Sequence, residues 1–325
     1  MSTLTSYYSL VEQQKRIDAS GNQAKIVEVL NRNIGQILAE APWMPSNDIW
    51  THKTTRRGSL PSGSRRKLNQ RIAQSTSSTT EIMDVIEMIE DYSDADVALV
   101  DSMPSPAMFR GGEVDAFIEG LGQTVASDVL YGDSNADPDG MHGLAARMGT
   151  LDGRFVIGAS GTGDDVTSIY VVTWSPDMCH MIYPKNMASN LGVQHTDKGQ
   201  VTSETADGLY EVYRDHYVIR CGLSVRDPRA IGRIANIESS GSTNIFDEDD
   251  LIALVNNMKI GAGTRIYVND TISTQMQIRM KDKANVNYTQ DSGDGLSAMP
   301  LMRFQGIPIR KMDREILLNT ESAIT

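Results

Sequence analysis

Residue types that catalyse reactions or bind cofactors occur throughout this chain, and the glycine-rich run at residues 158–163 comes nearest to a known motif. Its spacing is not the G-x-G-x-x-G of a dinucleotide loop, and Asp164 and Asp165 stand where a phosphate-binding helix would begin. Two carboxylates at that point would repel a pyrophosphate. We interpret the run as a turn between strands and predict no cofactor.

An acidic run at residues 133–140 has part of the spacing of a calcium-binding loop. Such a loop needs Gly at its sixth position and Glu at its twelfth, and these positions are Pro138 and Leu144 here. The histidines form no H-x-x-x-H pair and the cysteines form no C-x-x-C, so the sequence indicates no zinc site either. We predict no bound metal.

Cys179 and His180 are neighbours and could in principle be a nucleophile and its base. They lie on a predicted strand, however, where adjacent side chains point to opposite faces. We therefore predict that both are packing residues, and that Cys179 and Cys221 are buried thiols without a disulfide. We predict that the chain is not an enzyme.

Charge is distributed unevenly, although a net charge of -12 and a pI of about 4.9 describe an acidic chain. An acidic surface does not favour phosphate binding. Residues 52–71 contain seven basic residues and no acidic one, namely Lys53, Arg56, Arg57, Arg65, Arg66, Lys67 and Arg71. Residues 81–101 contain eight acidic residues and no Lys or Arg, namely Glu81, Asp84, Glu87, Glu90, Asp91, Asp94, Asp96 and Asp101.

The basic segment has a turn-forming centre at residues 58–64 and too few apolar residues to bury its own arms. We predict a long, exposed hairpin loop that either stays solvated or lies on another chain. Its charge would suit phosphate contact, but it has no Phe, Tyr or Trp on which bases could stack. We favour contact with the acidic block of a neighbouring subunit, because complementary charges fix the register of an interface. The predicted inter-subunit contacts are Lys53, Arg56, Arg57, Arg65, Arg66, Lys67, Arg71, Glu87, Glu90, Asp91 and Asp94.

The apolar pattern predicts an α+β fold. Helical spacing runs to about residue 40 and stops at Pro42 and Pro45, and a long helix covers residues 106–131 behind Ser105, which can cap it. Further helices are predicted at 247–258 and 271–283, and strands at 154–157, 168–174, 178–183, 209–215, 216–221, 231–237, 264–268 and 301–311. No stretch is apolar enough to cross a bilayer and the start does not have the order of a signal peptide, so we expect a cytoplasmic protein without a membrane partner.

Four stretches, in this order and spacing, carry a resemblance to a known family. They are EDYSDADVAL at 90–99, AFIEGL at 116–121, YGD at 131–133 leading to HGLA at 142–145, and FQGIPIRKMD at 304–313. The chain resembles the tailed-bacteriophage major capsid proteins that have the Hong Kong 97-type fold, and among these it is most similar to the phage epsilon-fifteen type.

The resemblance implies a structural protein that self-assembles as pentamers and hexamers into the icosahedral head around double-stranded DNA. Scaffolding, portal and decoration proteins would be its partners, and the virion its final location. The implied parts are an N-terminal arm at 1–49, an extended loop at 50–80, a peripheral domain at 81–153 and 295–325 with a spine helix at 106–131, and an axial domain at 154–294. Two alternatives remain open, a soluble nucleic-acid-binding protein that uses residues 52–71 and an enzyme with an unrecognised site.

Overall fold

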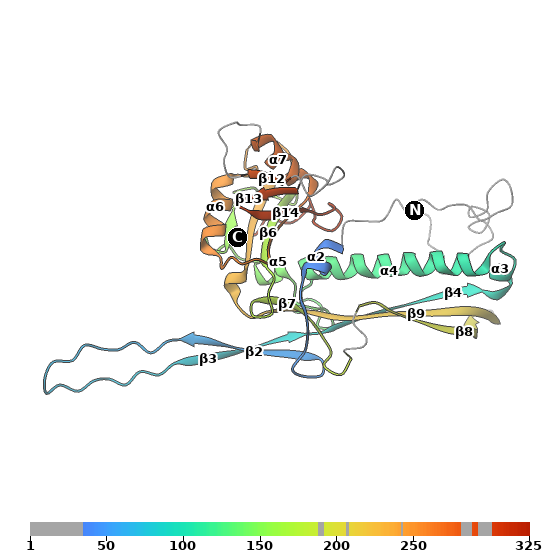
Figure 1. Ribbon diagram of the computed structural model, residues 1–325, viewed down its shortest axis with the longest axis horizontal. Coiled ribbons are helices and arrows are strands. Elements are labelled where there is room, and N and C mark those ends of the chain that lie inside the picture. The colour runs from blue at the N-terminus through green and yellow to red at the C-terminus, as the bar shows by residue number, and fades with distance from the viewer. Residues whose placement is uncertain (1–34, 188–191, 206–207, 242, 281–287, 292–300) are drawn as a thin grey trace. The chain divides into compact units, whose positions relative to one another are not determined.

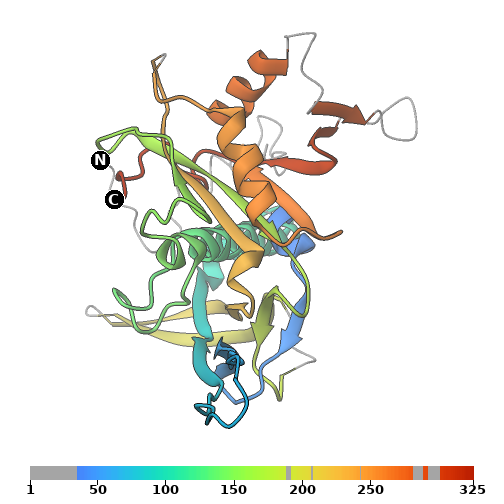
Figure 2. The same ribbon diagram turned by 90° about the vertical axis from the view of Figure 1, so that its left-hand side faces the viewer.

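The computed structural model describes residues 35–187, 192–205, 208–241, 243–280, 288–291 and 301–325, and it has the predicted α+β class (Figures 1 and 2). Its α-helices are α2 (Gly35–Glu40), α3 (Val97–Asp101), α4 (Pro106–Tyr131), α5 (Leu144–Arg147), α6 (Glu248–Asn257) and α7 (Asp270–Met280). Its strands are β1 (Trp43–Pro45), β2 (Thr51–Ser59), β3 (Ser78–Val85), β4 (Glu87–Asp96), β5 (Val156–Gly158), β6 (Val166–Thr173), β7 (Cys179–Tyr183), β8 (Gln194–Thr205), β9 (Gly208–Val225), β10 (Ile231–Glu238), β11 (Thr264–Val268), β12 (Tyr288–Asp291), β13 (Leu301–Phe304) and β14 (Ile307–Lys311). Within this described part, no helix is long and apolar enough to span a membrane.

The chain divides into two compact units. Of the described residues, unit 1 contains 88–125, 192–205 and 208–220, and unit 2 contains 35–87, 126–187, 221–241, 243–280, 288–291 and 301–325. The dividing points fall within β4, α4 and β9, so each of these elements contributes residues to both units. The units group the residues differently from the arm, loop, peripheral and axial parts, whose boundaries stay a prediction.

Unit 1 contains a long antiparallel ribbon of β8 and β9, in which Gln194 lies opposite Val218. The register shifts just before Gly199, whose φ of +73° is a left-handed conformation that glycine adopts without strain. The portion of α4 in this unit packs against the ribbon. The rings of Phe117 and Tyr217 are stacked there, with 4.9 Å between their centroids.

Unit 2 is built on a sheet with the strand order β12-β13-β14-β11-β6-β10-β5. The central strand β6 is buried along its whole length, in keeping with its uncharged sequence VTSIYVVT. Alternate residues serve different faces, because successive side chains of a strand point to opposite sides. Ile169 and Val171 join an apolar core with Leu254 of α6 and Ile272 of α7, whereas Ser168 belongs to a polar network.

β2 and β3 of unit 2 form an antiparallel hairpin, with Thr51 opposite Val85 and Ser59 opposite Ser78. Residues 60–77 between the strands are exposed throughout, and we call them the hairpin tip. The predicted exposed hairpin loop is confirmed. A different sheet contains β1, β7 and β9, in which Trp43 of β1 lies opposite Met181 of β7 in a parallel pairing.

Several predicted elements have the expected bounds, and α4 covers residues 106–131 as predicted. The predicted division between strands 209–215 and 216–221 is wrong, because both belong to the single strand β9. Asp215 looked like a strand end, but the structure buries it and Arg110 donates two hydrogen bonds to its carboxylate, at 2.9 and 3.0 Å. The strand could therefore continue through a charged residue.

Two further differences concern segments whose local sequence is ambiguous. β8 was not predicted, because QHTDKGQVTSET is largely polar and becomes a strand through its pairing with β9. The segment at 43–45, predicted only to stop a helix, is the strand β1. The predicted helix up to residue 40 is described only as α2, since residues 1–34 lie outside the described part, and so do the last three residues of the predicted helix at 271–283.

Candidate functional site

The hairpin tip and the adjoining end of β2 carry exposed basic and apolar side chains together. Three large apolar side chains are exposed, at 75% for Leu60, 89% for Leu68 and 52% for Ile72. Apolar side chains grouped on one exposed loop indicate an interaction surface more strongly than isolated ones do. The exposed basic residues beside them are Arg57, Arg65, Arg66, Lys67 and Arg71.

The base of the hairpin is fastened within the chain. The Arg56 guanidinium donates a hydrogen bond of 2.7 Å to the carbonyl oxygen of Arg226 and another to that of Val225. Lys53 lies 4.0 Å from Glu81 across the hairpin. Arg56 therefore anchors β2 to the end of β9. The basic residues nearer the hairpin tip are available to another molecule.

Glu87, also among the predicted contact residues, is buried in unit 2. It is 4% exposed, and its Oε2 accepts a hydrogen bond of 2.9 Å from the backbone N–H of Met141. Burial, together with the negative charge of Asp128, raises the pKa of this carboxyl to about 7. A side chain covered by its own chain cannot reach a neighbouring subunit, so Glu87 does not fit its predicted role.

In unit 1, Glu90 and Asp94 of β4 face basic side chains of β9. Arg214 donates hydrogen bonds of 2.6 and 2.5 Å to the Asp94 carboxylate. Glu90 lies 3.3 Å from Nε2 of His216 and 3.7 Å from Arg220. These partners were not predicted. Arg214, His216 and Arg220 are separated by even numbers of positions, so side chains at these positions of a strand lie on the same face.

A groove of 460 Å³ in unit 1 lies beside the acidic residues of β4. The lining combines apolar side chains from β4 and α4 with two exposed carboxylates, Glu90 and Asp91. Such a groove can accept an apolar side chain that has a basic neighbour. Its lining residues are Ile89, Glu90, Asp91, Ala116, Phe117, Gly120, Leu121 and Thr124.

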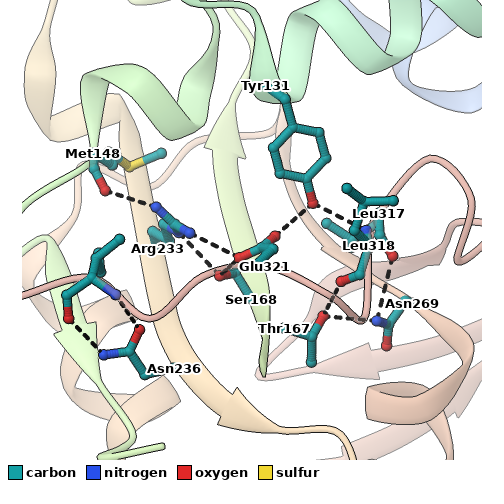
Figure 3. A network of polar contacts seen from close by, with 11 residues as sticks. Tyr131, Met148, Thr167, Ser168, Arg233, Asn236, Asn269, Leu317, Leu318 and Glu321 are labelled. Carbon is teal, nitrogen blue, oxygen red and sulfur yellow. Dashed lines mark hydrogen bonds and ion pairs between the residues drawn. The ribbon is translucent and has the colours of Figure 1, made fainter. Parts of the chain in front are cut away.

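A buried network around Glu321 holds the C-terminal segment on the sheet of unit 2 (Figure 3). Oε2 of Glu321 lies 2.8 Å from Nη2 of Arg233, and each side chain is 5% exposed. Arg233 also donates hydrogen bonds of 3.0 Å to the Ser168 hydroxyl and to the Met148 carbonyl. The hydroxyl of Tyr131, the last residue of α4, donates to Oε1 of Glu321 at 2.5 Å.

This network has the properties of a structural tie. Both carboxylate oxygens of Glu321 accept hydrogen bonds from buried groups, so neither is placed to take a proton from a substrate. Figure 3 shows the neighbouring contacts, in which the Thr167 hydroxyl donates to the Leu318 carbonyl at 2.8 Å. Sequence reasoning had no signal for this site, because Arg233 and Glu321 are 88 positions apart.

The residues considered as a nucleophile and its base are both buried on β7. Burial raises the pKa of Cys179 to about 12 and lowers that of His180 to about 4, which suits neither for nucleophilic catalysis at neutral pH. Their predicted packing role is confirmed, and Cys179 and Cys221 are buried, unbridged thiols as predicted. Among the described residues, no group of three or more His, Cys, Asp or Glu side chains is placed to hold a metal ion.

The chain is similar in sequence and fold to known proteins. A family model described as "Major capsid protein GP7" matches residues 18–325. A chain in the structure of bacteriophage Epsilon15 is 27% identical, with a TM-score of 0.78 and a match that covers 100% of both chains. A chain of the bacteriophage JBD30 capsid is 11% identical with a TM-score of 0.48, and the match covers 95% of each chain. No curated protein matches the sequence.

Proposed function

Because the chain belongs to the major capsid protein GP7 family, we propose that its copies assemble as pentamers and hexamers into an icosahedral shell around double-stranded DNA. The family match over residues 18–325 carries this proposal. The chain has the Hong Kong 97-type capsid fold, and its family consists of structural proteins. Such a subunit is found in the virion capsid. Assembly in the host cytoplasm, with scaffolding, portal and decoration proteins as partners, is part of the proposal.

The parts of the subunit follow from the same proposal. An arm at 1–49 and an extended loop at 50–80 would connect neighbours, and an axial domain at 154–294 would surround the five- and six-fold positions. The peripheral domain would comprise 81–153 and 295–325. The β2–β3 hairpin and the long helix α4 at 106–131 support the assignments of the loop and the spine helix.

We further propose that the hairpin tip of one copy docks into the groove of unit 1 of a second copy. The tip offers Leu68 and other exposed apolar side chains among positive charges, and the groove offers an apolar lining with a negative margin. Asp91 is the preferred acidic partner, since Glu90 already has His216 and Arg220 beside it. Complementary charge would set the register of this contact, and the apolar side chains would add affinity.

Charge reversal of the hairpin tip tests this proposal. The triple variant Arg65→Glu, Arg66→Glu and Lys67→Glu should fold normally, because these side chains are exposed and surface changes alter stability by about 0.5 kcal/mol or less. It should fail to form shells in electron microscopy. A control with the same change of charge, Arg154→Glu, Lys198→Glu and Arg279→Glu, alters exposed positions outside the tip.

Adding Asp91→Arg to the triple variant should restore part of the shell yield. Asp139→Arg, at another exposed acidic position, is the control and should restore nothing. Restoration by Asp91→Arg alone would identify Asp91 as the partner of the hairpin tip. Normal shell yield from the triple variant would refute a role for the charge of the tip. Purified wild-type protein that stays monomeric under all assembly conditions would instead refute the shell itself.

A further inference from the structure

Four strands of unit 2 bring buried polar side chains together at the base of the β2–β3 hairpin. His52 of β2 lies opposite Asp84 of β3, and His180 of β7 lies opposite Ser224 of β9. All four residues are buried, His180 and Ser224 completely. The imidazole rings of His52 and His180 meet edge to face, with 5.5 Å between their centroids. The cluster therefore joins the hairpin to the sheet that contains β7 and β9.

Several atoms of this cluster are buried without a hydrogen-bond partner among the described residues. Both ring nitrogens of His180 are in this state, and so are Nδ1 of His52 and Oγ of Ser224. Buried polar atoms are normally paired, so an exception of this kind calls for an explanation. Here the unpaired atoms belong to the side chains that hold the hairpin against its own chain.

The charges around the two rings are mixed. Asp84 favours protonation of both rings and Arg226 opposes it. His180 is also influenced by Asp177, which favours its protonation, and by the His52 ring, which opposes it. Asp84 is itself paired with Arg147 of α5 at 2.7 Å, which reduces its effect on the rings. The Arg56 guanidinium, which anchors β2, also lies in the field of Asp84 and Arg147.

We propose that His52 and His180 form a pH-sensitive latch, which holds the base of the hairpin while both rings are neutral and releases it when a ring is protonated. A proton would place a charge in a buried site, and the positive charge of Arg226 opposes it there. Opening of the hairpin would let water solvate that charge. The latch concerns the attachment of the hairpin within one chain, so it does not depend on where the tip docks.

The sign of the effect follows from burial, which lowers the pKa of both rings, that of His180 from 6.5 to about 4. Below pH 6.5 the open hairpin takes up a proton that the closed hairpin does not, so acid favours opening. Each unit of difference in pKa corresponds to a factor of ten in the equilibrium. Between pH 7 and pH 4.5 the open population should therefore rise on the order of 100-fold.

Amide hydrogen exchange of the full-length protein tests the latch. Protection factors, corrected for the intrinsic effect of pH on exchange, would be measured at pH 7 and 4.5 in peptides covering β2 and β7. β11, in the core of unit 2, provides the reference. Wild-type β2 should lose protection on the order of 100-fold while β11 keeps its own. In His180→Phe, which keeps a ring that cannot be protonated, most of this loss should disappear.

His216→Phe is the matched control, because the ring of His216 in unit 1 also contacts another ring, that of Tyr92, on which it stacks at 4.4 Å between centroids. It should behave like the wild type. Equal loss of β2 protection in His180→Phe and the wild type would overturn the latch, and so would a wild-type β2 that is insensitive to pH. NMR titration of the wild-type histidines gives a test that needs no variant, since a His180 ring that titrates at or above pH 6 would also overturn it.

Discussion

Two buried glutamates of unit 2 show how surroundings decide what one residue type does. Glu321 is paired with Arg233 and receives further hydrogen bonds, so its charge is compensated in the folded chain. Glu87 instead faces Asp128 and the thiol of Cys221, whose Sγ lies 3.5 Å from its Oε1. The first stabilises the fold as a carboxylate, and the second is favoured as the protonated acid near neutral pH.

We expect Glu87→Gln to stabilise the chain above neutral pH. The pKa of Glu87 is raised from 4.5 to about 7, so the folded chain binds this proton more tightly than the unfolded chain. The resulting stability is complete below pH 4.5 and is lost as the pH rises to 7, a change of about 3 kcal/mol. Urea unfolding at pH 5 and pH 8 checks this. The free energy of unfolding of the variant should exceed that of the wild type only at pH 8. An equal difference at both pH values would contradict a raised pKa of Glu87.

Arg233→Met should destabilise the chain by about 3–5 kcal/mol, because it leaves the Glu321 carboxylate buried without its cation. Adding Glu321→Leu should recover much of the loss, since an apolar pair of similar volume often replaces a buried ion pair without cost. Chemical denaturation of both variants measures the two changes. A loss below about 1 kcal/mol for Arg233→Met would mean that the pair contributes little.

Among the elements, α4 combines a buried face with exposed glycines. Leu121, Val125 and Val129 recur at helical spacing and are buried, which explains why the pattern predicted the helix. Gly111 and Gly120 lie on the same helix with open space where a Cβ would be. Glycine inside a helix lowers its stability. These glycines therefore make the helix less stable than alanines at the same positions would.

Gly111→Ala and Gly120→Ala should each stabilise the unassembled subunit by about 0.5–1 kcal/mol. The contrasting variant is Gly143→Ala, whose Cβ would lie 2.6 Å from the carbonyl oxygen of Asp128 and should destabilise the chain. Thermal unfolding separates the two outcomes. Stabilisation by Gly143→Ala, or none by the helix variants, would show that the local space around these glycines is not what limits stability.

At the scale of the whole molecule, the proposed contact between copies has a charged part and an apolar part that salt can distinguish. Salt shortens the Debye length from about 10 Å at 0.1 M to 3 Å at 1 M, so it weakens exposed charge pairs and leaves apolar contact. Shell yield should fall with salt in the wild type. In Leu68→Ser the shell yield, measured by light scattering, should be lower at every salt concentration but should depend on salt in the same way. A wild-type shell yield that does not change with salt would exclude a contribution of charge pairs to the contact.

The features that depend on neighbouring residues in the chain could be predicted before the fold was known. The helix at 106–131, the exposed hairpin around residues 58–64 and the strand at 264–268 follow from periodicity and turn residues, which act locally. The stretches quoted from 90–99 to 304–313 also indicated the capsid family, which the match over 18–325 confirms.

Which distant charges meet depends on the folded chain. The fold joins Asp94 to Arg214 and Arg233 to Glu321, buries Glu87, and continues β9 through Asp215 without a break. No local pattern encodes these outcomes, because the environment of a charged side chain is built from strands far apart in the sequence. The basic hairpin was thus predictable as an exposed charge, whereas the accessibility of its acidic counterparts depended on the folded chain.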